Sequence, residues 1–591
     1  MFRMFVCRGM LLFFSRKRCI ISTYKPNSVD FKRKKNMKKT IAFLLSLCMI
    51  AVSVPFPASA AEAPLKLMVA ADTHFQCEAD LGEPSNEYTE YMLDAETFGY
   101  ASTQGQMNYE SEAILAEMLD EFAASDAECL LIAGDLTCGK RASHLAFAEY
   151  LRKTEQISGK RIFVINGNHD CAAESSENRI SMEEFREIYA DFGYNEALSR
   201  HGSSASFTVD LDESRRLIAV DSCVYGEDDG KIGASVFRWI KEQVKQAKKD
   251  GKTLIAMMHH SILPHYELQP MIGNWRYYAS WFADHGINTV LTGHIHANDA
   301  SSTVSDLGNT LYDVQTGALI SSPNTYRILT IKEDEIEIES RFITHIDASL
   351  LPGFLTAAQK EKLTGDFPSY AKEYFVEGVC KWMNRNVGSP NRIARWFRLK
   401  EGTKAYSAAE GITARLGAAV GMDIYDSGTG PSIESSLAPY NISVPESPYR
   451  KPYEAAAKLM FGFFHGDEDA SGNEKDVQLL LVCLEGALLT AMKDAADESS
   501  LRALAAAMKI KIDAAKTVSS TQTAAWMRQL AEKLAEAFLE TLAGGFVDDY
   551  SAPSDLNVTL TFDESRTSAS PLHFVVKLFR MFIEFVQKLW R

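Results

Sequence analysis

The chain has 591 residues, of which 62 are Lys or Arg and 78 are Asp or Glu, giving a net charge of −16. Residues 1–60 carry 12 of the basic residues and one acidic residue, so the remainder has a net charge of −27. A field of that sign repels nucleic acid and anionic lipid at long range and argues against a nucleic-acid-binding protein. The length is sufficient for two or more domains.

The N-terminal segment has the pattern of an export signal. Residues 37–60 begin with basic residues, continue with the apolar run 41–54 and end on small residues at Ala60, as signal peptides do. The apolar run is shorter than the roughly 20 residues that a membrane span requires. Residues 1–36 are interpreted as an upstream mis-start of translation. The chain is therefore predicted to be secreted or held at the cell surface, with lipidation at Cys48 as the alternative to signal cleavage.

Two regions with different predicted secondary structure follow the signal. From 65 to 346, apolar β-branched-rich runs that predict buried strands alternate with patterns that predict helices. The predicted strands are 65–70, 130–133, 162–165, 254–258 and 287–291, with a closing hairpin at 326–331 and 335–343, and the predicted helices are 112–124, 144–154 and 234–248. Residues 350–591 are predicted to form a mostly helical second region, with a linker near 428–452 that contains Pro and Ser.

The second region contains two amphipathic patterns. One places apolar residues at four-residue steps and needs a partner surface to cover the resulting stripe, which is made of Trp526, Leu530, Leu534, Phe538 and Leu542. The other, 572–590, is predicted to be a helix that docks on its own domain. A helix in contact with the cell surface, the membrane surface or a partner protein is the alternative.

Five short polar fragments carry the chemistry of the chain, and each follows a predicted strand. They contain Asp72 and His74; Gly134 and Asp135; Gly167, Asn168, His169 and Asp170; His259 and His260; and Gly293, His294 and His296. Side chains at the ends of several strands can converge on one rim. Imidazole, carboxylate and amide groups without thiolate suit two divalent cations, which together assist the cleavage of phosphoesters. The ordered set therefore predicts a two-metal phosphoester-cleaving site.

These fragments resemble the calcineurin-like metallophosphoesterase superfamily, whose pattern is D-x-H, G-D, G-N-H-[DE], H and G-H-x-H. The resemblance covers 65–346 and implies an α/β (α+β) four-layer sandwich of two mixed sheets flanked by helices, followed here by the helical region. Longer stretches, including 180–195, resemble secreted bacterial metallophosphoesterases. The segment 134–139 lacks the D-R-G ending of the superfamily's protein phosphatases, which favours the diester-cleaving and small-molecule branches.

The resemblance also implies a role for each site residue. The first metal ion would be bound by Asp72, His74, Asp135 and His296, and the second by Asp135, Asn168, His259 and His294, with Asp135 bridging the two. The two divalent ions would be Mn, Fe or Zn.

His169 would contact the phosphoryl group and protonate or stabilise the leaving oxygen without binding metal. Asp170 would orient ligands or cap its own loop. His260 is interpreted as a neighbour of the ligand His259.

The function predicted on this basis is an exported, dimetal-dependent phosphodiesterase in which a metal-bridging hydroxide attacks phosphorus in line. Its substrate would be a small-molecule or headgroup phosphoester, and nucleic acid is not expected. An extracellular phosphomonoesterase is the alternative within enzymes. A non-enzymatic surface-binding protein with a vestigial catalytic domain is the alternative outside them.

Two weaker patterns lie near these fragments. Cys138 and Cys171 each stand three residues beyond a predicted ligand, which raises the hypothesis of a disulfide at the rim, with two packed thiols as the alternative. His265 and the segment 275–277 fall between the fourth and fifth fragments and could contact substrate or belong to the surface and core.

Overall fold

The computed structural model of this chain describes residues 63–81, 105–265, 269–387, 399–466, 470–495, 497–510, 522–543 and 555–562. The predicted mis-start (1–36), signal peptide (37–60) and terminal amphipathic segment (572–590) lie outside the described residues. Among the described residues, no helix has the length and apolar character that crossing a membrane requires.

The first half of the chain alternates strands and helices, as predicted. Its strands are β1 (Leu65–Ala70), β2 (Cys129–Ala133), β3 (Arg161–Ile165), β4 (Ser199–Arg200), β5 (Phe207–Asp210), β6 (Arg215–Val220), β7 (Thr253–Met258), β8 (Ile287–Thr292), β9 (Asp299–Val304), β10 (Thr310–Gln315), β11 (Thr325–Ile331) and β12 (Glu335–Phe342). Its helices are α5 (Ser111–Ala124), α6 (Arg141–Ser158), α7 (Met182–Ile188), α8 (Ala234–Asp250) and α9 (Trp275–Asp284), with the short turns η1 (Ala190–Tyr194) and η2 (Ala348–Leu350). Each of the five predicted strands is confirmed to within one residue at either end.

The strands form two mixed sheets. The first has the order β13-β12-β11-β1-β2-β3, in which β1, β2 and β3 are parallel and the remaining neighbours are antiparallel. The second has the order β4-β5-β6-β7-β8-β10-β9, with a parallel centre from β6 to β10. Parallel strands with both faces covered are apolar throughout, which is why these strands could be recognised as continuous apolar runs.

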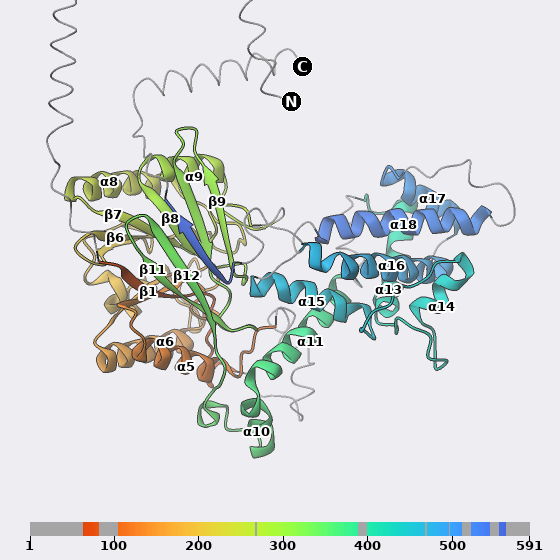
Figure 1. The fold of residues 1–591 in the computed structure, drawn as a ribbon, viewed down its shortest axis with the longest axis horizontal. Helices are drawn as coiled ribbons and strands as arrows, with labels where there is room; N and C mark the ends of the chain where they lie inside the picture. Colours follow the sequence, from red (N-terminus) through yellow and green to blue (C-terminus); the bar gives the residue numbers. More distant parts are fainter. Residues whose placement is uncertain are drawn as a thin grey trace, which may run out of the picture. The chain divides into compact units, whose positions relative to one another are not determined.

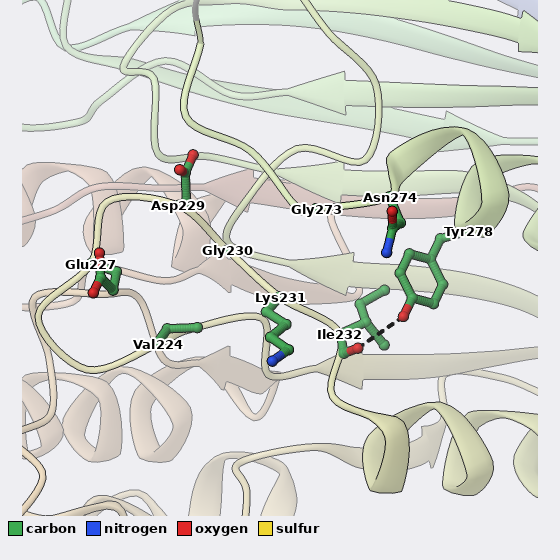
Figure 2. A pocket seen from close by; sticks show the side chains of 9 residues that line it. All are labelled: Val224, Glu227, Asp229, Gly230, Lys231, Ile232, Gly273, Asn274 and Tyr278. Atoms are coloured by element: carbon green, nitrogen blue, oxygen red, sulfur yellow. Dashed lines mark hydrogen bonds between the residues drawn. The ribbon is translucent and has the colours of Figure 1, made fainter.

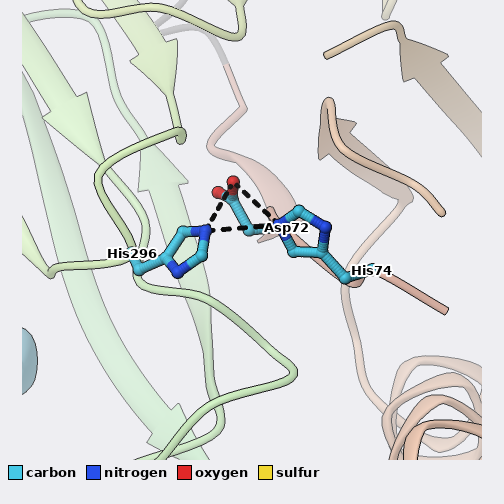
Figure 3. A group of neighbouring side chains, drawn as sticks. All are labelled: Asp72, His74 and His296. Atoms are coloured by element: carbon cyan, nitrogen blue, oxygen red, sulfur yellow. Dashed lines mark hydrogen bonds and ion pairs between the residues drawn. The ribbon is translucent and has the colours of Figure 1, made fainter. Parts of the chain in front are cut away.

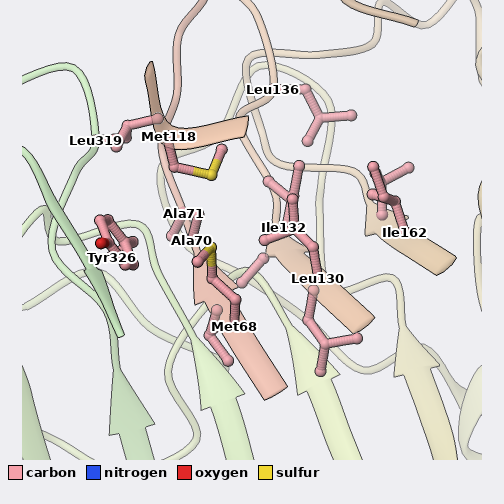
Figure 4. Close-up of a cluster of buried hydrophobic side chains, with 14 of the residues drawn as sticks. Met68, Ala70, Ala71, Met118, Leu130, Ile132, Leu136, Ile162, Leu319 and Tyr326 are labelled. Atoms are coloured by element: carbon pink, nitrogen blue, oxygen red, sulfur yellow. The ribbon is translucent and has the colours of Figure 1, made fainter. Parts of the chain in front are cut away.

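Helices cover the outer faces of the two sheets. Helices α5 and α6 lie on the outside of the first sheet, and α8 and α9 lie on the outside of the second (Figure 1). Residues such as Met68, Leu130 and Met118 are fully buried between the first sheet and its helices (Figure 4). The predicted four-layer α/β (α+β) sandwich is therefore confirmed.

The second half of the chain is mostly helical and has its own apolar core. Its elements are α10 (Ala357–Gly365), α11 (Phe367–Val387), α13 (Lys404–Val420), α14 (Ile433–Leu437), η3 (Ala438–Tyr440), α15 (Pro452–His465), α16 (Ala470–Ala495), α17 (Glu498–Ala507) and α18 (Gln522–Ala543). The predicted apolar stripe lies on α18, which packs against α16 with Trp526, Leu530 and Leu534 buried. For these three residues, helix α16 supplies the partner surface that the sequence pattern required.

One strand of the second half was not predicted. Strand β13 (Asn557–Thr561) pairs antiparallel with β12, so that Ile338 lies opposite Val558 and Glu337 opposite Thr559. This pairing adds a strand from the far end of the described chain to the first sheet. The domain boundaries at 346 and 350 and the linker near 428–452 stay predictions.

Candidate metal centre

The loops that follow β1, β2, β3, β7 and β8 meet at one rim of the two sheets. The backbone amide of Asp72 donates to the carbonyl of Gly134 at 3.1 Å, and that of Gly293 donates to the carbonyl of His259 at 3.0 Å. Gly293 allows this approach because a Cβ there would lie 2.5 Å from Asp72 Oδ2. The structure thus brings all five predicted fragments together.

The first cluster consists of Asp72, His74 and His296 (Figure 3). Nε2 of His296 lies 3.4 Å from Asp72 Oδ1 and 3.3 Å from His74 Nε2. Asp72 uses its Oδ2 to accept a hydrogen bond from the His294 amide at 2.9 Å, whereas its buried Oδ1 accepts none. Three buried donor atoms with one orphaned carboxylate oxygen fit a divalent cation.

The second cluster consists of Asp135, His259 and His294, with Asn168 beside them. Nε2 of His259 lies 3.3 Å from Asp135 Oδ2, 3.0 Å from Asn168 Oδ1 and 3.2 Å from His294 Nδ1. The other ring nitrogen of His259 donates to the carbonyl of Ala133 at 2.9 Å. When the ring is neutral, that hydrogen bond fixes the tautomer whose Nε2 lone pair is directed into the cluster.

Asp135 stands between the two clusters. Its Oδ2 lies 3.5 Å from Nε2 of His74 and 3.3 Å from Nε2 of His259, one imidazole from each cluster. Its Oδ1 accepts a hydrogen bond from the backbone amide of His169 at 2.9 Å. A carboxylate held in this way is suited to be shared by two cations.

Two histidines of the site have pKa values shifted in opposite directions. Burial lowers the pKa of His74 to about 3, so its imidazole is neutral and can act as a ligand at neutral pH. Burial alone would also lower the pKa of His259, but the adjacent Asp135 carboxylate outweighs it and raises that pKa to about 9. Because a proton and a cation would compete for His259 Nε2, metal binding there releases a proton.

The backbone of the site is strained. Positive φ angles occur at five of the seven predicted ligands, namely Asp72 (49°), His74 (36°), Asp135 (48°), His294 (77°) and His296 (67°). Such angles cost of the order of 1–3 kcal/mol each in a residue other than glycine and persist only where the surroundings impose them. The loops are therefore built to direct these side chains inward at the expense of local stability.

His169 lies at the edge of the site rather than inside a cluster. Its side chain is 43% exposed, and its Nε2 lies 3.9 Å from Asp135 Oδ2. The Arg179 guanidinium donates to the carbonyl of His169 at 3.1 Å and to that of Cys138 at 3.3 Å, which ties two of the loops together. This position lets the imidazole meet a molecule that enters from solvent.

Asp170 joins two of the fragments. Its buried carboxylate accepts hydrogen bonds from the backbone amides of Gly167 (2.8 Å), Leu136 (3.2 Å) and Thr137 (3.0 Å). Burial and the charge of Asp135 raise the pKa of Asp170. These contacts combine the two roles weighed for Asp170, because the side chain caps its own loop and orients the loop that carries Asp135.

His260 is engaged elsewhere. Its Nδ1 lies 2.9 Å from the Ser222 hydroxyl and its Nε2 lies 3.2 Å from the carbonyl of Asp228, while its ring packs 4.3 Å from the ring of His294. Both ring nitrogens of His260 are therefore used in hydrogen bonds outside the two clusters, and its ring packs against the candidate ligand His294. Ser222 and Asp228 belong to none of the five fragments, so no sequence pattern indicated their contacts with His260.

A cavity of about 320 Å³ lies between the segments 224–232 and 273–278 (Figure 2). It is lined by Val224, Glu227, Asp229, Gly230, Lys231, Ile232, Gly273, Asn274 and Tyr278. Gly230 packs against the His260 ring, and the Tyr278 hydroxyl donates to the carbonyl of Ile232 at 3.0 Å. Of the segment weighed for substrate contact, Tyr277 is 53% exposed and Arg276 stacks on Trp275.

His265 belongs to the interior rather than to a substrate surface. It is fully buried, with Nδ1 2.8 Å from Asp299 Oδ2 and Nε2 3.5 Å from Asp313 Oδ2. Asp313 also accepts hydrogen bonds from the amides of Ile262 and Leu263, which fixes the loop after His259 and His260. The histidine and its two carboxylates form a buried ionic triad.

The hypothesis of a disulfide between Cys138 and Cys171 is wrong. Both residues have free thiols, and Cys171 is buried. The Cys138 sulfur accepts a hydrogen bond from Gln76 Nε2 at 3.3 Å and lies 4.0 Å from His74 Nδ1. Both cysteines are packed small side chains.

Comparisons with known proteins found matches to the first half of this chain. Residues 65–298 match the sequence profile of the family described as calcineurin-like phosphoesterase. A probable cyclic nucleotide phosphodiesterase from Psychrobacter arcticus is 28% identical over 156 residues, which make up 26% of this chain and 50% of that relative. The match thus spans half the length of that curated relative.

Solved structures with a similar arrangement include two phosphatases. A dimetal phosphatase from Danio rerio aligns with 48% of this chain and 97% of its own, at 10% identity and a TM-score of 0.34. A purple acid phosphatase from yellow lupin (Lupinus luteus) aligns with 49% of this chain and 52% of its own, at 11% identity and a TM-score of 0.31.

Proposed function

Because residues 65–298 match the calcineurin-like phosphoesterase family, we propose that this protein is an exported, dimetal-dependent phosphodiesterase. The observation that carries the proposal is the sharing of Asp135 between two histidine-containing clusters, with Nε2 of His74 at 3.5 Å and Nε2 of His259 at 3.3 Å from the same oxygen. One carboxylate between two sets of ligands is what a pair of closely spaced cations requires.

The two clusters would hold one divalent cation each. The first would use Asp72, His74, Asp135 and His296, and the second Asp135, Asn168, His259 and His294. When bound, the cations would neutralise phosphoryl charge and lower the pKa of a coordinated water, which is the chemistry that phosphoester hydrolysis needs. The imidazole-rich donor set suits Mn, Fe or Zn.

The remaining residues of the site would position groups and move a proton. His169, at the exposed edge, would deliver a proton from its imidazole to the departing oxygen. Asp170 would keep the loops of Asp135 and His169 in register through its three backbone hydrogen bonds. The buried neutral ring of His74 would keep its lone pair directed at the first cation.

Two observations support a diester as the substrate. The relative from Psychrobacter arcticus is named as a probable cyclic nucleotide phosphodiesterase, and the segment 134–139 lacks the ending found in protein phosphatases. Export is supported by the signal-like pattern of residues 37–60. The substrate would be a small-molecule or headgroup phosphoester.

A substrate panel tests the proposal. The purified chain, loaded with Mn²⁺ or Zn²⁺ and analysed for metal content, is assayed on a bis-aryl phosphodiester, cyclic nucleotides, glycerophosphodiesters and an aryl phosphomonoester. We expect turnover of at least one diester to exceed that of the monoester. Faster cleavage of the monoester would overturn the proposed preference for diesters. Inactivity of a chain that has both metals bound would overturn the proposal that the protein is an enzyme.

A further inference from the structure

The C-terminal end of helix α15 contacts the loop that carries two of the candidate ligands. Asn298, two residues after His296, is fully buried. Its backbone amide donates to the carbonyl of Phe464 at 3.2 Å, and its side-chain Nδ2 lies 3.3 Å from the same carbonyl and 3.2 Å from that of His465. A residue of the phosphoesterase domain thus provides donors for the last carbonyls of a helix from the second half.

These donors meet a general need of helices, because the last carbonyls of an α-helix have no partner within the helix. In α15 the cap residue is Gly466, at a φ of 82°, and its amide donates to the carbonyl of Gly462 at 2.9 Å. A Cβ on Gly466 would lie 2.8 Å from the carbonyl oxygen of Asn298 and 2.9 Å from its Cβ. The approach between helix and loop therefore depends on a glycine at this position.

Asn298 also forms hydrogen bonds with residues of its own domain. Its Oδ1 accepts hydrogen bonds from the Gly317 amide at 2.9 Å and from Arg327 Nε at 3.2 Å, and its Nδ2 also reaches the Thr325 hydroxyl at 3.0 Å. The neighbouring amide of Ala318 donates to the carbonyl of His296 at 3.2 Å. The loop is thus held between helix α15 and the strands of its own domain.

We propose that Asn298 is a positioning residue through which helix α15 holds His294 and His296 in their ligand-binding conformation. Both histidines have positive φ angles, 77° and 67°, which need outside support to persist. The helical second half is then a working part of the metal centre rather than a separate module. Metal binding by this loop rests on the function proposed above.

A pair of matched variants of the full chain tests this. Gly466→Ala introduces a methyl group against Asn298, whereas Gly251→Ala changes the equivalent cap residue of α8, at a φ of 72° and with nothing within 4 Å of its Cβ. Both variants place alanine at a helix cap with a positive φ, but only the methyl group at 466 meets a neighbouring residue. We expect hydrogen–deuterium exchange of residues 293–298 to become about tenfold faster in Gly466→Ala and to stay unchanged in Gly251→Ala.

Metal affinity supplies the second readout, measured by competition between each variant and a chromogenic chelator for Zn²⁺. Loss of a residue that orients ligands lowers metal affinity by about 10- to 100-fold. Because His296 belongs to the first cluster and His294 to the second, we expect Gly466→Ala and Asn298→Ala to lower the affinity of both sites. Equal exchange and equal affinity in Gly466→Ala and Gly251→Ala would overturn the inference.

The outcome separates this inference from the proposed function. Hydrogen exchange requires neither metal nor substrate, so it decides whether α15 supports the loop even if the chain cleaves no phosphoester. A wild-type chain that binds two metals but lacks activity would refute the function alone. Unchanged exchange in both Gly466→Ala and Asn298→Ala would refute the positioning role alone.

Discussion

Replacement of His265 should weaken the fold in a manner that depends on pH. The imidazole is fully buried between Asp299 and Asp313, at 2.8 Å and 3.5 Å. Burial alone would lower its pKa, but the two carboxylates outweigh burial and raise the pKa from 6.5 to about 10. A shift of that size corresponds to about 5 kcal/mol, close to the roughly 3–5 kcal/mol lost when one partner of a buried ion pair is removed.

The sign follows from the direction of the shift. The folded chain keeps the proton on His265 up to a pH of about 10, whereas the unfolded chain releases it near the ordinary value of 6.5. The stabilisation is therefore complete below pH 6.5, declines as the pH rises and disappears above about pH 10. Wild-type protein should lose most of this contribution on going from about pH 6 to about pH 9.5, and His265→Gln should have none to lose.

Urea unfolding followed by tryptophan fluorescence at both pH values measures the effect. The control is His345→Gln, which breaks an ion pair with Glu117 at 2.9 Å whose histidine is 69% exposed, and such surface pairs contribute less than about 1 kcal/mol. The free energy of unfolding of His265→Gln should fall well below that of wild type at the lower pH and approach it at the higher one. A deficit of equal size at both pH values would show that packing, not the ionic triad, sets the cost.

Three further outcomes follow from the site. His169→Ala should lower turnover by about 10²- to 10⁴-fold with both metals retained, and loss of metal on atomic absorption would contradict a role at the leaving group. His259→Ala should bind one metal fewer, whereas His260→Asn should keep full stoichiometry because both His260 nitrogens already have partners. Zn²⁺ binding near neutral pH should release a proton from His259, whose pKa of about 9 keeps it charged, and calorimetric titration in two buffers of different ionisation enthalpy would detect its absence.

The strands, and the convergence of the polar side chains that follow them, could be predicted from sequence because both depend on local signals. The buried parallel strands appear as uninterrupted apolar runs, and a polar residue just after such a run must lie at the edge of the sheet. His259 is preferred over His260 because it occupies the position after the apolar strand where the resembled superfamily has its ligand. In the structure, Nε2 of His259 lies 3.3 Å from Asp135 Oδ2, and its Nδ1 is bonded to the carbonyl of Ala133. The roles assigned to the ligands stay predictions until metal is bound.

The features that escaped prediction depend on distant parts of the chain. In the sequence, His265 lies between β7 and β8, and no nearby residue indicates that it is buried. Its carboxylate partners, Asp299 and Asp313, come from β9 and β10. Asn298 follows a recognisable fragment, but its partner carbonyls lie at 464 and 465. Strand β13 is short and half-polar, so only its pairing with β12 distinguishes it from a loop.

The pairing of β13 with β12 has a consequence for how the protein is made. Residues 335–339 leave the ribosome long before residues 557–561, so the edge of the first sheet stays uncovered while the entire helical half is synthesised. An uncovered edge strand can pair with other chains, and contacts between distant segments form slowly. We therefore expect chains truncated before residue 557 to aggregate. We also expect completion of the first sheet to be a late step in the folding of this protein.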